Sequence, residues 1–221
     1  MARTITALAA FAIALSAFML PAHAVPEPAE VPLSWELDVR IEKPIAISAE
    51  VPGSDEKQVF WYLRYEIINR TGEDRDFVPE IFLYTDTGHI VRADASVPSA
   101  VYDKIRKLHN DPLMRKVSGM AGKVLQGEDN SKRGVAVFRD FDPKAGGFDI
   151  FIGGLSGETQ TMKLPAPIEV VETDLRGNKK KVVKDTVTLN KTLQLTYDIF
   201  GEAAARPRSR VILEDRKWVM R

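Results

Sequence analysis

Cysteine is absent from all 221 residues of the chain. Its absence excludes disulfides, thiol nucleophiles, thiolate zinc sites and iron–sulfur clusters together. Histidine is almost as scarce: His23 lies within the N-terminal 24 residues, which are predicted to be removed, and this leaves His89 and His109. Neither of these belongs to a serine elbow or to another paired catalytic motif. We therefore predict that the protein is not an enzyme and that it has no catalytic or cofactor-binding residue.

An excess of charge is also missing, because 31 basic residues balance 31 acidic ones. Arg3 is the single charged residue among the N-terminal 24 residues. Without it, 31 − 1 = 30 basic residues stand against 31 acidic ones, a net charge of −1. A nearly neutral chain creates no long-range field that would attract nucleic acid or anionic lipid. The basic run from Arg176 to Lys184 has no interleaved aromatic residues on which bases could stack. It indicates a solvated hairpin tip, or a contact with an acidic envelope polymer, rather than nucleic-acid binding.

Long apolar runs are confined to residues 1–24. Arg3, the apolar stretch from Ile5 to Leu20 and the small-residue pattern Ala22-His23-Ala24 predict an export signal that is removed by cleavage. An uncleaved N-terminal anchor is the alternative. We expect an exported protein, periplasmic or extracellular, with no membrane span after cleavage. Residues 25–33 are rich in proline and predict an extended tether with little packing.

Residues 34–221 are predicted to form a single domain around the stretch from Val59 to Val91. This stretch predicts two β-strands joined by a polar turn. In the first strand, every second residue is apolar and lies on one face: Val59, Trp61, Leu63, Tyr65 and Ile67. The second strand carries Phe77, Ile81 and Leu83. The same alternation predicts a strand with one solvated face from Ser34 to Glu42.

A helical insertion is predicted near residues 98–125. Pro98 suits the start of a helix, and Val101, Ile105 and Leu108 would form one stripe against a sheet. Asn110 and Pro112 end this helix. The segment from Leu113 to Leu125 has near-helical spacing but is interrupted by glycine. Residues 127–130 then read as a loop.

The C-terminal half predicts further strands separated by turn residues. Residues 168–173 and 182–189 would form a hairpin over the turn Arg176-Gly177-Asn178. The other predicted strands are residues 134–141, 148–152, 192–200 and 211–218. Together these elements predict a mainly β fold, an antiparallel two-sheet immunoglobulin-like sandwich with one helical insertion.

Two acidic loops, residues 72–76 and 127–130, share the order Gly-Glu-Asp. Calcium takes six to eight oxygen ligands, commonly from carboxylates and amides on loops. If the loops converge at one end of the sandwich, they offer a speculative calcium site from Glu73, Asp74, Asp76, Glu128, Asp129 and Asn130. The alternative is that these residues are solvated turn residues that cap strands and helices.

Two other chemistries have weaker support. His109, Met114 and Met120 are residue types that bind copper, but methionine at irregular spacing is typical of core packing. Asp140 and Asp142, two apart on a predicted strand, would share a face as paired glycosidase carboxylates do. A solvated face explains them equally well.

Several short blocks stand in a fixed order along nearly the whole mature chain: TGEDRDFVPE (71–80), TDTG (85–88), VPSAVYDKI (97–105), LQGEDN (125–130), GLSGET (154–159), KTLQLTY (191–197) and KWVMR (217–221). In these blocks the chain resembles a family of uncharacterised exported bacterial proteins. The resemblance implies one domain family and an envelope location. It implies no known activity, so it assigns no catalytic or binding residue.

The sequence thus favours an exported, non-catalytic β-sandwich protein that serves as an interaction or structural module of the bacterial envelope. Its partner would be an envelope protein or polymer, recognised by loops at one end of the sandwich or at an exposed strand edge. The alternative is a domain that binds calcium or a small ligand, or more remotely hydrolyses glycans, through the two acidic loops.

Overall fold

The computed structural model describes residues 25–173, 177–201 and 209–221. The predicted export signal and Arg176 of the basic run lie outside these residues. Within them, no helix is both long enough and apolar enough to cross a membrane.

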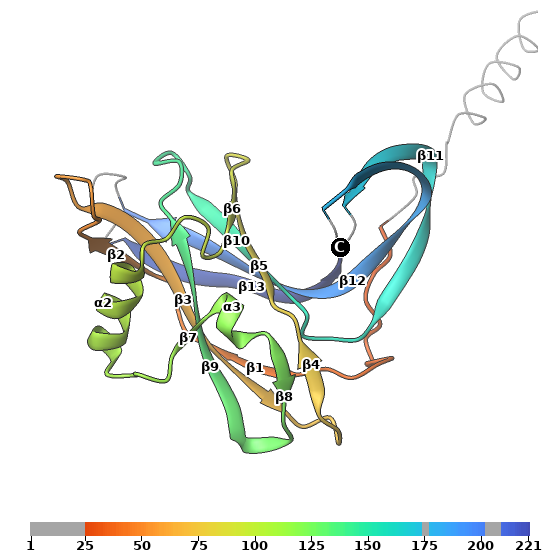
Figure 1. Cartoon of the computed structure of the whole chain (residues 1–221), viewed down its shortest axis with the longest axis horizontal. Helices are drawn as coiled ribbons and strands as arrows, with labels where there is room; N and C mark the ends of the chain where they lie inside the picture. The colour runs from red at the N-terminus through yellow and green to blue at the C-terminus, as the bar shows by residue number, and fades with distance from the viewer. Residues whose placement is uncertain (1–24, 174–176, 202–208) are drawn as a thin grey trace, which may run out of the picture.

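Two β-sheets make up most of the molecule (Figure 1). The first has the order β1-β3-β9-β7, with β2 also pairing with β3, and only the short β7 runs parallel to its neighbour. Its strands are β1 (Asp38–Ile41), β2 (Ile45–Ala49), β3 (Gln58–Asn69), β7 (Arg115–Lys116) and β9 (Gly127–Arg139).

The second sheet has the order β11-β12-β10-β5-β6, and β13 pairs with the other edge of β12. Its strands are β5 (Glu80–Thr85), β6 (Ile90–Arg92), β10 (Gly147–Gly153), β11 (Thr159–Thr173), β12 (Lys179–Phe200) and β13 (Arg210–Met220). A separate small pair joins β4 (Arg75–Phe77) to β8 (Gly122–Val124).

The main core lies between the two sheets. Alternate residues of β3, including Trp61 and Leu63, meet Leu83 of β5, Ile150 of β10 and Leu195 of β12 in one buried apolar cluster. The mainly β prediction is therefore confirmed, and the two sheets share a core as predicted.

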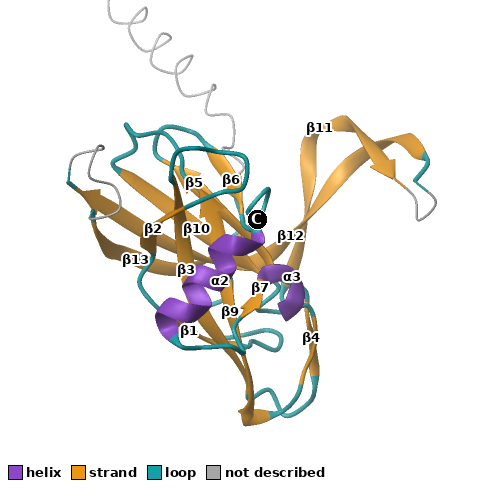
Figure 2. Ribbon diagram, turned by 60° about the vertical axis from the view of Figure 1, so that its left-hand side comes forward, coloured by secondary structure: helices purple, strands orange, loops and turns teal. Residues whose placement is uncertain are grey.

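The central strand β3 is buried on both faces along most of its length. Trp61, Leu63, Tyr65 and Ile67 face the main core as predicted, whereas Val59 is half-buried and lies outside that cluster. Phe60 and Tyr62 lie on the opposite face and form a second buried cluster with the helix α2 (Ser99–His109) (Figure 2). The sequence does not clearly predict that this second face is buried, because the charged residues Arg64 and Glu66 lie on it and suggest exposure to solvent.

The two strands predicted within residues 59–91 are present and lie in different sheets. β3 belongs to the first sheet and β5 to the second, so the chain crosses between layers here. Phe77 is separated from β5 by Val78 and Pro79 and pairs instead with Gly122 of β8. The local pattern predicts the two strands but not this crossing between sheets, because sheet membership depends on the distant partners β9 and β10.

Helix α2 begins and ends as predicted, but the predicted stripe is wrong in its last member. Val101, Tyr102 and Ile105 are buried, whereas Leu108 is 63% exposed. In the last turn it is His109 that reaches the sheet, where its Nε2 lies 2.8 Å from the Tyr62 hydroxyl. Asn110 ends the helix in the left-handed conformation, with φ of 48°.

Two neighbouring predictions are also corrected. Within residues 113–125 the helix is the single turn α3 (Val117–Met120), which lies between the short strands β7 and β8. Residues 127–130 are the exposed beginning of β9 rather than a loop, because Gly127 pairs with Asn69 of β3. A strand end with both faces in solvent has a polar composition, which sequence alone cannot distinguish from a loop.

Candidate functional site

The most unusual feature of the described molecule is a two-stranded ribbon, formed by residues 159–173 and 179–190, that leaves the body of the sandwich (Figure 1). We call it the arm. Its pairing runs from Thr159 with Asn190 to Thr173 with Lys179, and its register shifts between Lys163 and Ile168. The predicted pairing of the two strands is confirmed, while Arg176 of the predicted turn lies outside the described residues. The second strand does not stop at residue 189. β12 continues without a break into the body, where β10 and β13 pair with it.

The arm carries apolar side chains that the body does not cover. Ile168 is 47% exposed, Val171 58% and Val183 69%. Isolated two-stranded hairpins are marginally stable in water, because neither face of the ribbon is covered. Exposed aliphatic residues on such a ribbon suit a surface that another molecule covers.

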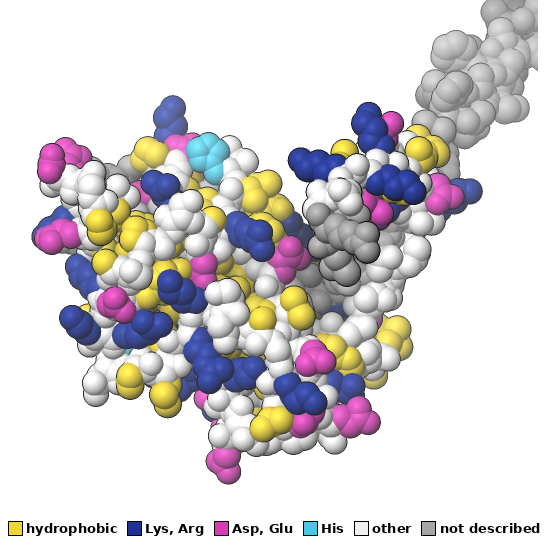
Figure 3. All heavy atoms as spheres, in the orientation of Figure 1, with side chains coloured by type: hydrophobic (Ala, Val, Ile, Leu, Met, Phe, Trp, Pro, Cys, Tyr) yellow, Lys and Arg dark blue, Asp and Glu magenta, His cyan; other side chains and the backbone are white. Residues whose placement is uncertain are grey.

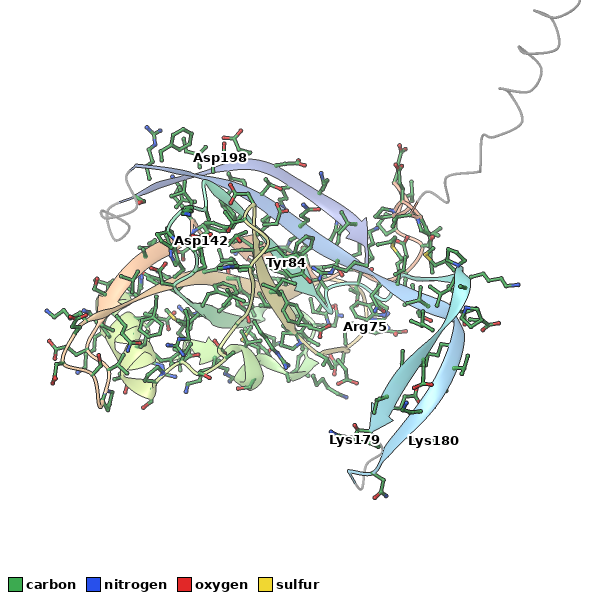
Figure 4. The ribbon with its side chains drawn as sticks, turned by 90° about the horizontal axis from the view of Figure 1, so that it is seen from above. Arg75, Tyr84, Asp142, Lys179, Lys180 and Asp198 are labelled. Atoms are coloured by element: carbon green, nitrogen blue, oxygen red, sulfur yellow. The ribbon has the colours of Figure 1, made fainter. Side chains whose placement is uncertain are left out.

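The outer part of the arm is also basic. Figure 4 shows Lys179 and Lys180 at its far end, and Figure 3 shows basic side chains on its surface. Two further lysines form cross-strand ion pairs, Lys181 with Glu169 at 2.5 Å and Lys184 with Glu172 at 2.6 Å. Within residues 168–173 and 179–184 there are four lysines and two glutamates, so this part has a net charge of 4 − 2 = +2.

The arm is anchored by a buried ionic cluster where it joins the body. Lys191 is 2% exposed and Glu158 3% exposed. The Lys191 Nζ lies 3.0 Å from Glu158 Oε2 and 2.5 Å from Glu36 Oε1. Burial alone would lower the pKa of Lys191, but its hydrogen bonds to Glu36 and Glu158 outweigh burial and raise it. The ammonium group therefore stays charged and joins β11, β12 and the segment before β1.

The segment of residues 25–33 packs against this cluster, although the sequence suggests a loose tether. The Ala29 N–H donates to Glu158 Oε1 at 3.0 Å, and the Lys191 ammonium donates to the Ala29 carbonyl oxygen at 3.3 Å. The backbone donor at Ala29 is the largest influence that holds the pKa of Glu158 below its usual value. Between this segment and the end of β13 lies a cavity of about 580 Å³, lined in part by Trp218.

The strand predicted from Ser34 to Glu42 is divided at the same junction. Its second half is β1, which pairs with β3. Its first half runs along the start of the arm, where the Leu37 N–H donates to Leu155 O and the Gly157 N–H donates to Trp35 O. A Cβ at Gly157 would lie 2.4 Å from Trp35 Nε1, so only glycine fits this close approach.

Residues 72–76 and the beginning of β9 lie close together, and an amide network joins them. Asn69 is fully buried, and its Nδ2 donates to the carbonyl oxygens of Glu73 and Val124, both at 2.8 Å. Its Oδ1 accepts hydrogen bonds from Thr71 and from Gln126 Nε2. Asn69 and Gln126 therefore join the two acidic segments through their side-chain amides.

The predicted calcium ligands themselves point to different partners. Glu128 binds two arginines, with Arg40 at 2.5 Å and Arg70 at 3.0 Å, and these hydrogen bonds lower its pKa. The other contacts are as follows: Glu73 pairs with Arg75, Asp74 accepts from the Gln126 N–H, Asn130 donates to Gln126 O, and Asp76 lies in β4 opposite Lys123. Asp129 lies exposed in β9. Over the part of the chain that the structure describes, no three His, Asp or Glu residues gather as a metal site would require.

The residues considered for copper and for glycan hydrolysis have structural contacts. Met114 and Met120 belong to separate buried clusters. β9 ends at Arg139, so Asp140 and Asp142 do not share a strand face as predicted. Asp140 accepts a hydrogen bond from Trp61 Nε1 at 2.9 Å, and Asp142 accepts one from the Lys144 N–H.

A second hollow lies on the outer face of the second sheet. Arg221 stacks on Tyr84 and Phe151, with its guanidinium carbon 4.4 Å and 4.2 Å from the two ring centroids. Its Nη2 donates to the Tyr84 hydroxyl. Its Nη1 is buried without a hydrogen-bond partner among the described residues. The hollow measures about 440 Å³ and is also lined by Glu80.

Comparisons with protein-family models, with curated proteins and with solved structures found no match for this chain. The resemblance to an exported bacterial family stays a prediction, and the site must be interpreted from its own chemistry.

The sequence does contain an indication of the ionic cluster that anchors the arm. It lies within the apolar alternation of β12 and is easily overlooked there. Residues 193, 195 and 197 of β12 point inward, and Lys191 lies on the same alternation. A lysine at an inward position indicates a buried ion pair. Its partners Glu36 and Glu158 lie far away in sequence, and for that reason the cluster was missed.

Proposed function

We propose that the protein is a non-catalytic interaction module and that the arm is the element that binds its partner. The main support for this proposal is that a ribbon of two long strands projects from the body with exposed valine and isoleucine side chains. The buried cluster at Lys191 supports it, because a firmly anchored ribbon presents its surface in one orientation. Such preorganisation reduces the conformational entropy lost on binding.

The export signal predicted in the sequence suggests that this interaction occurs in the bacterial envelope. The partner would then be an envelope protein or polymer. We also propose the finer class of an immunoglobulin-like sandwich; two facing, mostly antiparallel sheets with a shared core support it.

Site-specific photo-cross-linking in cells that express the protein tests the arm directly. A photoreactive amino acid replaces Val183 or Val171 on the arm, and Val78, which is 70% exposed on the body, is the matched control. We expect adducts of defined mass from the two arm positions and none from position 78. Equal adducts from all three positions, or none from the arm, would contradict the proposal.

A second candidate function is the binding of a small ligand that carries a carboxylate, and the hollow at Arg221 favours it. The aromatic rings hold the guanidinium in a fixed plane, and one of its nitrogens lacks a partner among the described residues. A carboxylate would satisfy that nitrogen. Thermal unfolding with a series of carboxylates tests this function: a rise in Tm that Arg221→Gln removes supports it, and an unchanged Tm contradicts it.

A further inference from the structure

The arm has an edge that no described strand occupies. In the body, β12 pairs with β13 along one side, and β13 ends where Asn190 pairs with Arg221. Beyond this point, from residue 189 back to 179, β12 pairs with β11 alone among the described strands. The opposite edge of β12 therefore continues the line of β13 without a neighbour.

The hydrogen bonds at Asn190 show which backbone groups face that open edge. The Asn190 N–H donates to Arg221 O at 2.7 Å, and its carbonyl oxygen accepts from the Arg221 N–H at 3.1 Å. The next residue, Lys191, donates its N–H to Glu158 O on the other side. Successive residues of a strand direct their backbone groups to opposite sides. Even-numbered residues from Thr188 down to Lys180 therefore direct both N–H and C=O to the open edge.

A side-chain contact agrees with this orientation. The hydroxyl oxygens of Thr188 and Thr161 lie 3.4 Å apart across the ribbon. Side chains approach most closely at pairs that do not exchange backbone hydrogen bonds with each other. The backbone of Thr188 is thus directed away from β11 and toward the open edge.

We propose that the arm binds an extended segment of a partner protein, which adds to the free edge of β12 as a further antiparallel strand and continues the line of β13. This inference rests on the proposed function and specifies the binding mode of the same arm. Open edges are templates for strand addition, since the added backbone satisfies groups that are otherwise left to water.

The side chains beside the edge specify the chemistry of that segment. One face of β12 presents Lys180 and Lys184, which favour acidic residues on the added strand. The other face presents Val183, Val187 and Leu189, which favour apolar residues, and also carries Asp185, Lys179 and Lys181, the last of which already pairs with Glu169. Because directly opposite residues share a face, the segment alternates acidic and apolar side chains.

A labelled peptide of alternating valine and glutamate, about nine residues long, is the probe, and fluorescence anisotropy with the purified protein is the measurement. We expect saturable binding, and we expect a peptide of the same composition without alternation to bind at least about tenfold more weakly. Methylation of the amide nitrogens on one side of the peptide should abolish binding, because it removes the donors of an added strand.

Thr186 provides matched variants. Thr186→Pro removes an N–H that faces the open edge and spares the hydrogen bonds to β11, whereas Thr186→Val keeps that N–H. We expect Thr186→Pro to weaken peptide binding at least about tenfold and Thr186→Val to bind like the unmodified protein. The double variant Lys180→Glu and Lys184→Glu does not change the backbone, and it should reduce binding of the acidic peptide and create binding of a valine–lysine peptide.

Three results of the peptide-binding experiments would overturn the strand-addition inference. They are no saturable binding, equal binding of the alternating and non-alternating peptides, and equal binding by the proline variant with an unchanged unfolding midpoint. A dimer in sedimentation velocity that Thr186→Pro dissociates would also overturn it, in favour of a second copy on the edge. If cross-links from Val183 persist in the Thr186→Pro protein, the arm still binds a partner, and only the strand-addition mode fails.

Discussion

The two halves of β12 belong to one continuous strand but lie in opposite surroundings. From Lys191 onward the strand lies between β10 and β13, and its inward residues Leu193, Leu195 and Tyr197 are buried. Before Lys191 it has β11 as its one described neighbour, and most of its side chains are exposed. The body therefore derives its stability from its own core. The arm contributes little to that core and is available for a partner.

The largest effect should appear at the boundary between the two halves. Lys191→Met leaves the carboxylates of Glu36 and Glu158 without their buried cation, which we expect to destabilise the protein by about 3 to 5 kcal/mol. Urea unfolding measures the change. Lys217→Met is the control, because Lys217 is exposed and its pair with Asp215 contributes about 0 to 1 kcal/mol. A loss below about 1 kcal/mol for Lys191→Met would show that the cluster does not anchor the arm.

The same isoleucine-to-alanine substitution should lower the unfolding free energy by different amounts in the body and in the arm. Ile150 is fully buried in β10, and Ile168 is exposed on the arm. We expect Ile150→Ala to cost about 2 to 5 kcal/mol in unfolding free energy and Ile168→Ala less than about 0.5 kcal/mol. Equal costs in urea unfolding would mean that the arm packs against the body in solution.

The network between the acidic loops should depend on its amides rather than on calcium. Asn69→Ala leaves buried backbone groups unpaired, and we expect a loss of about 1 to 3 kcal/mol. Added calcium should not shift the melting temperature, since the Glu128 carboxylate already forms ion pairs with two arginines. A calcium-dependent rise in Tm that Asp74→Ala or Asp129→Ala abolishes would restore the calcium hypothesis.

The smallest expected effect is a pH dependence of the protein's stability, which arises from His109 in the body. Burial and the charge of Arg64 lower the pKa of His109, and Arg64 donates a hydrogen bond to its Nδ1. The unfolded chain therefore binds a proton more readily than the folded one. The stabilisation is complete above the unfolded pKa of about 6.5 and is lost as the pH falls through the lower folded value.

Urea unfolding between pH 7.5 and pH 5, the range around the unfolded histidine pKa of about 6.5, measures this loss. His109→Gln should flatten the profile, and His89→Gln, at an exposed loop position, should not. A profile that His109→Gln leaves unchanged would show that other groups cause the pH dependence.

Local pattern was sufficient to predict most strands, the helix α2 and the hairpin of the arm. Alternating residues such as Trp61 and Leu63 indicate a strand whatever its partners are. The pattern could not show that β3 and β5 lie in different sheets, because that choice depends on β9 and β10. It also could not show that residues 127–130 continue β9, since strand ends exposed on both faces have no apolar period.

The candidate site was predicted only in outline. An exposed strand edge and a basic hairpin tip were expected, but which part of β12 has an open side depends on its register with β13, which pairs with residues 191–200. That register is a tertiary feature without a local signal. Lys191 gave a local signal through its inward position, while Glu36 and Glu158 become its partners only in the folded chain.

Residue-resolved hydrogen exchange by NMR tests the central claim, a free edge on an ordered arm, most directly. We expect strong protection of β3, β9 and β10 in the body. Along residues 180–189 protection should alternate, with slow exchange at odd-numbered amides bonded to β11 and fast exchange at even-numbered amides that face the open edge. Uniform protection of these amides in the isolated protein would contradict the account, because another part of the chain or a second copy would then already cover the edge.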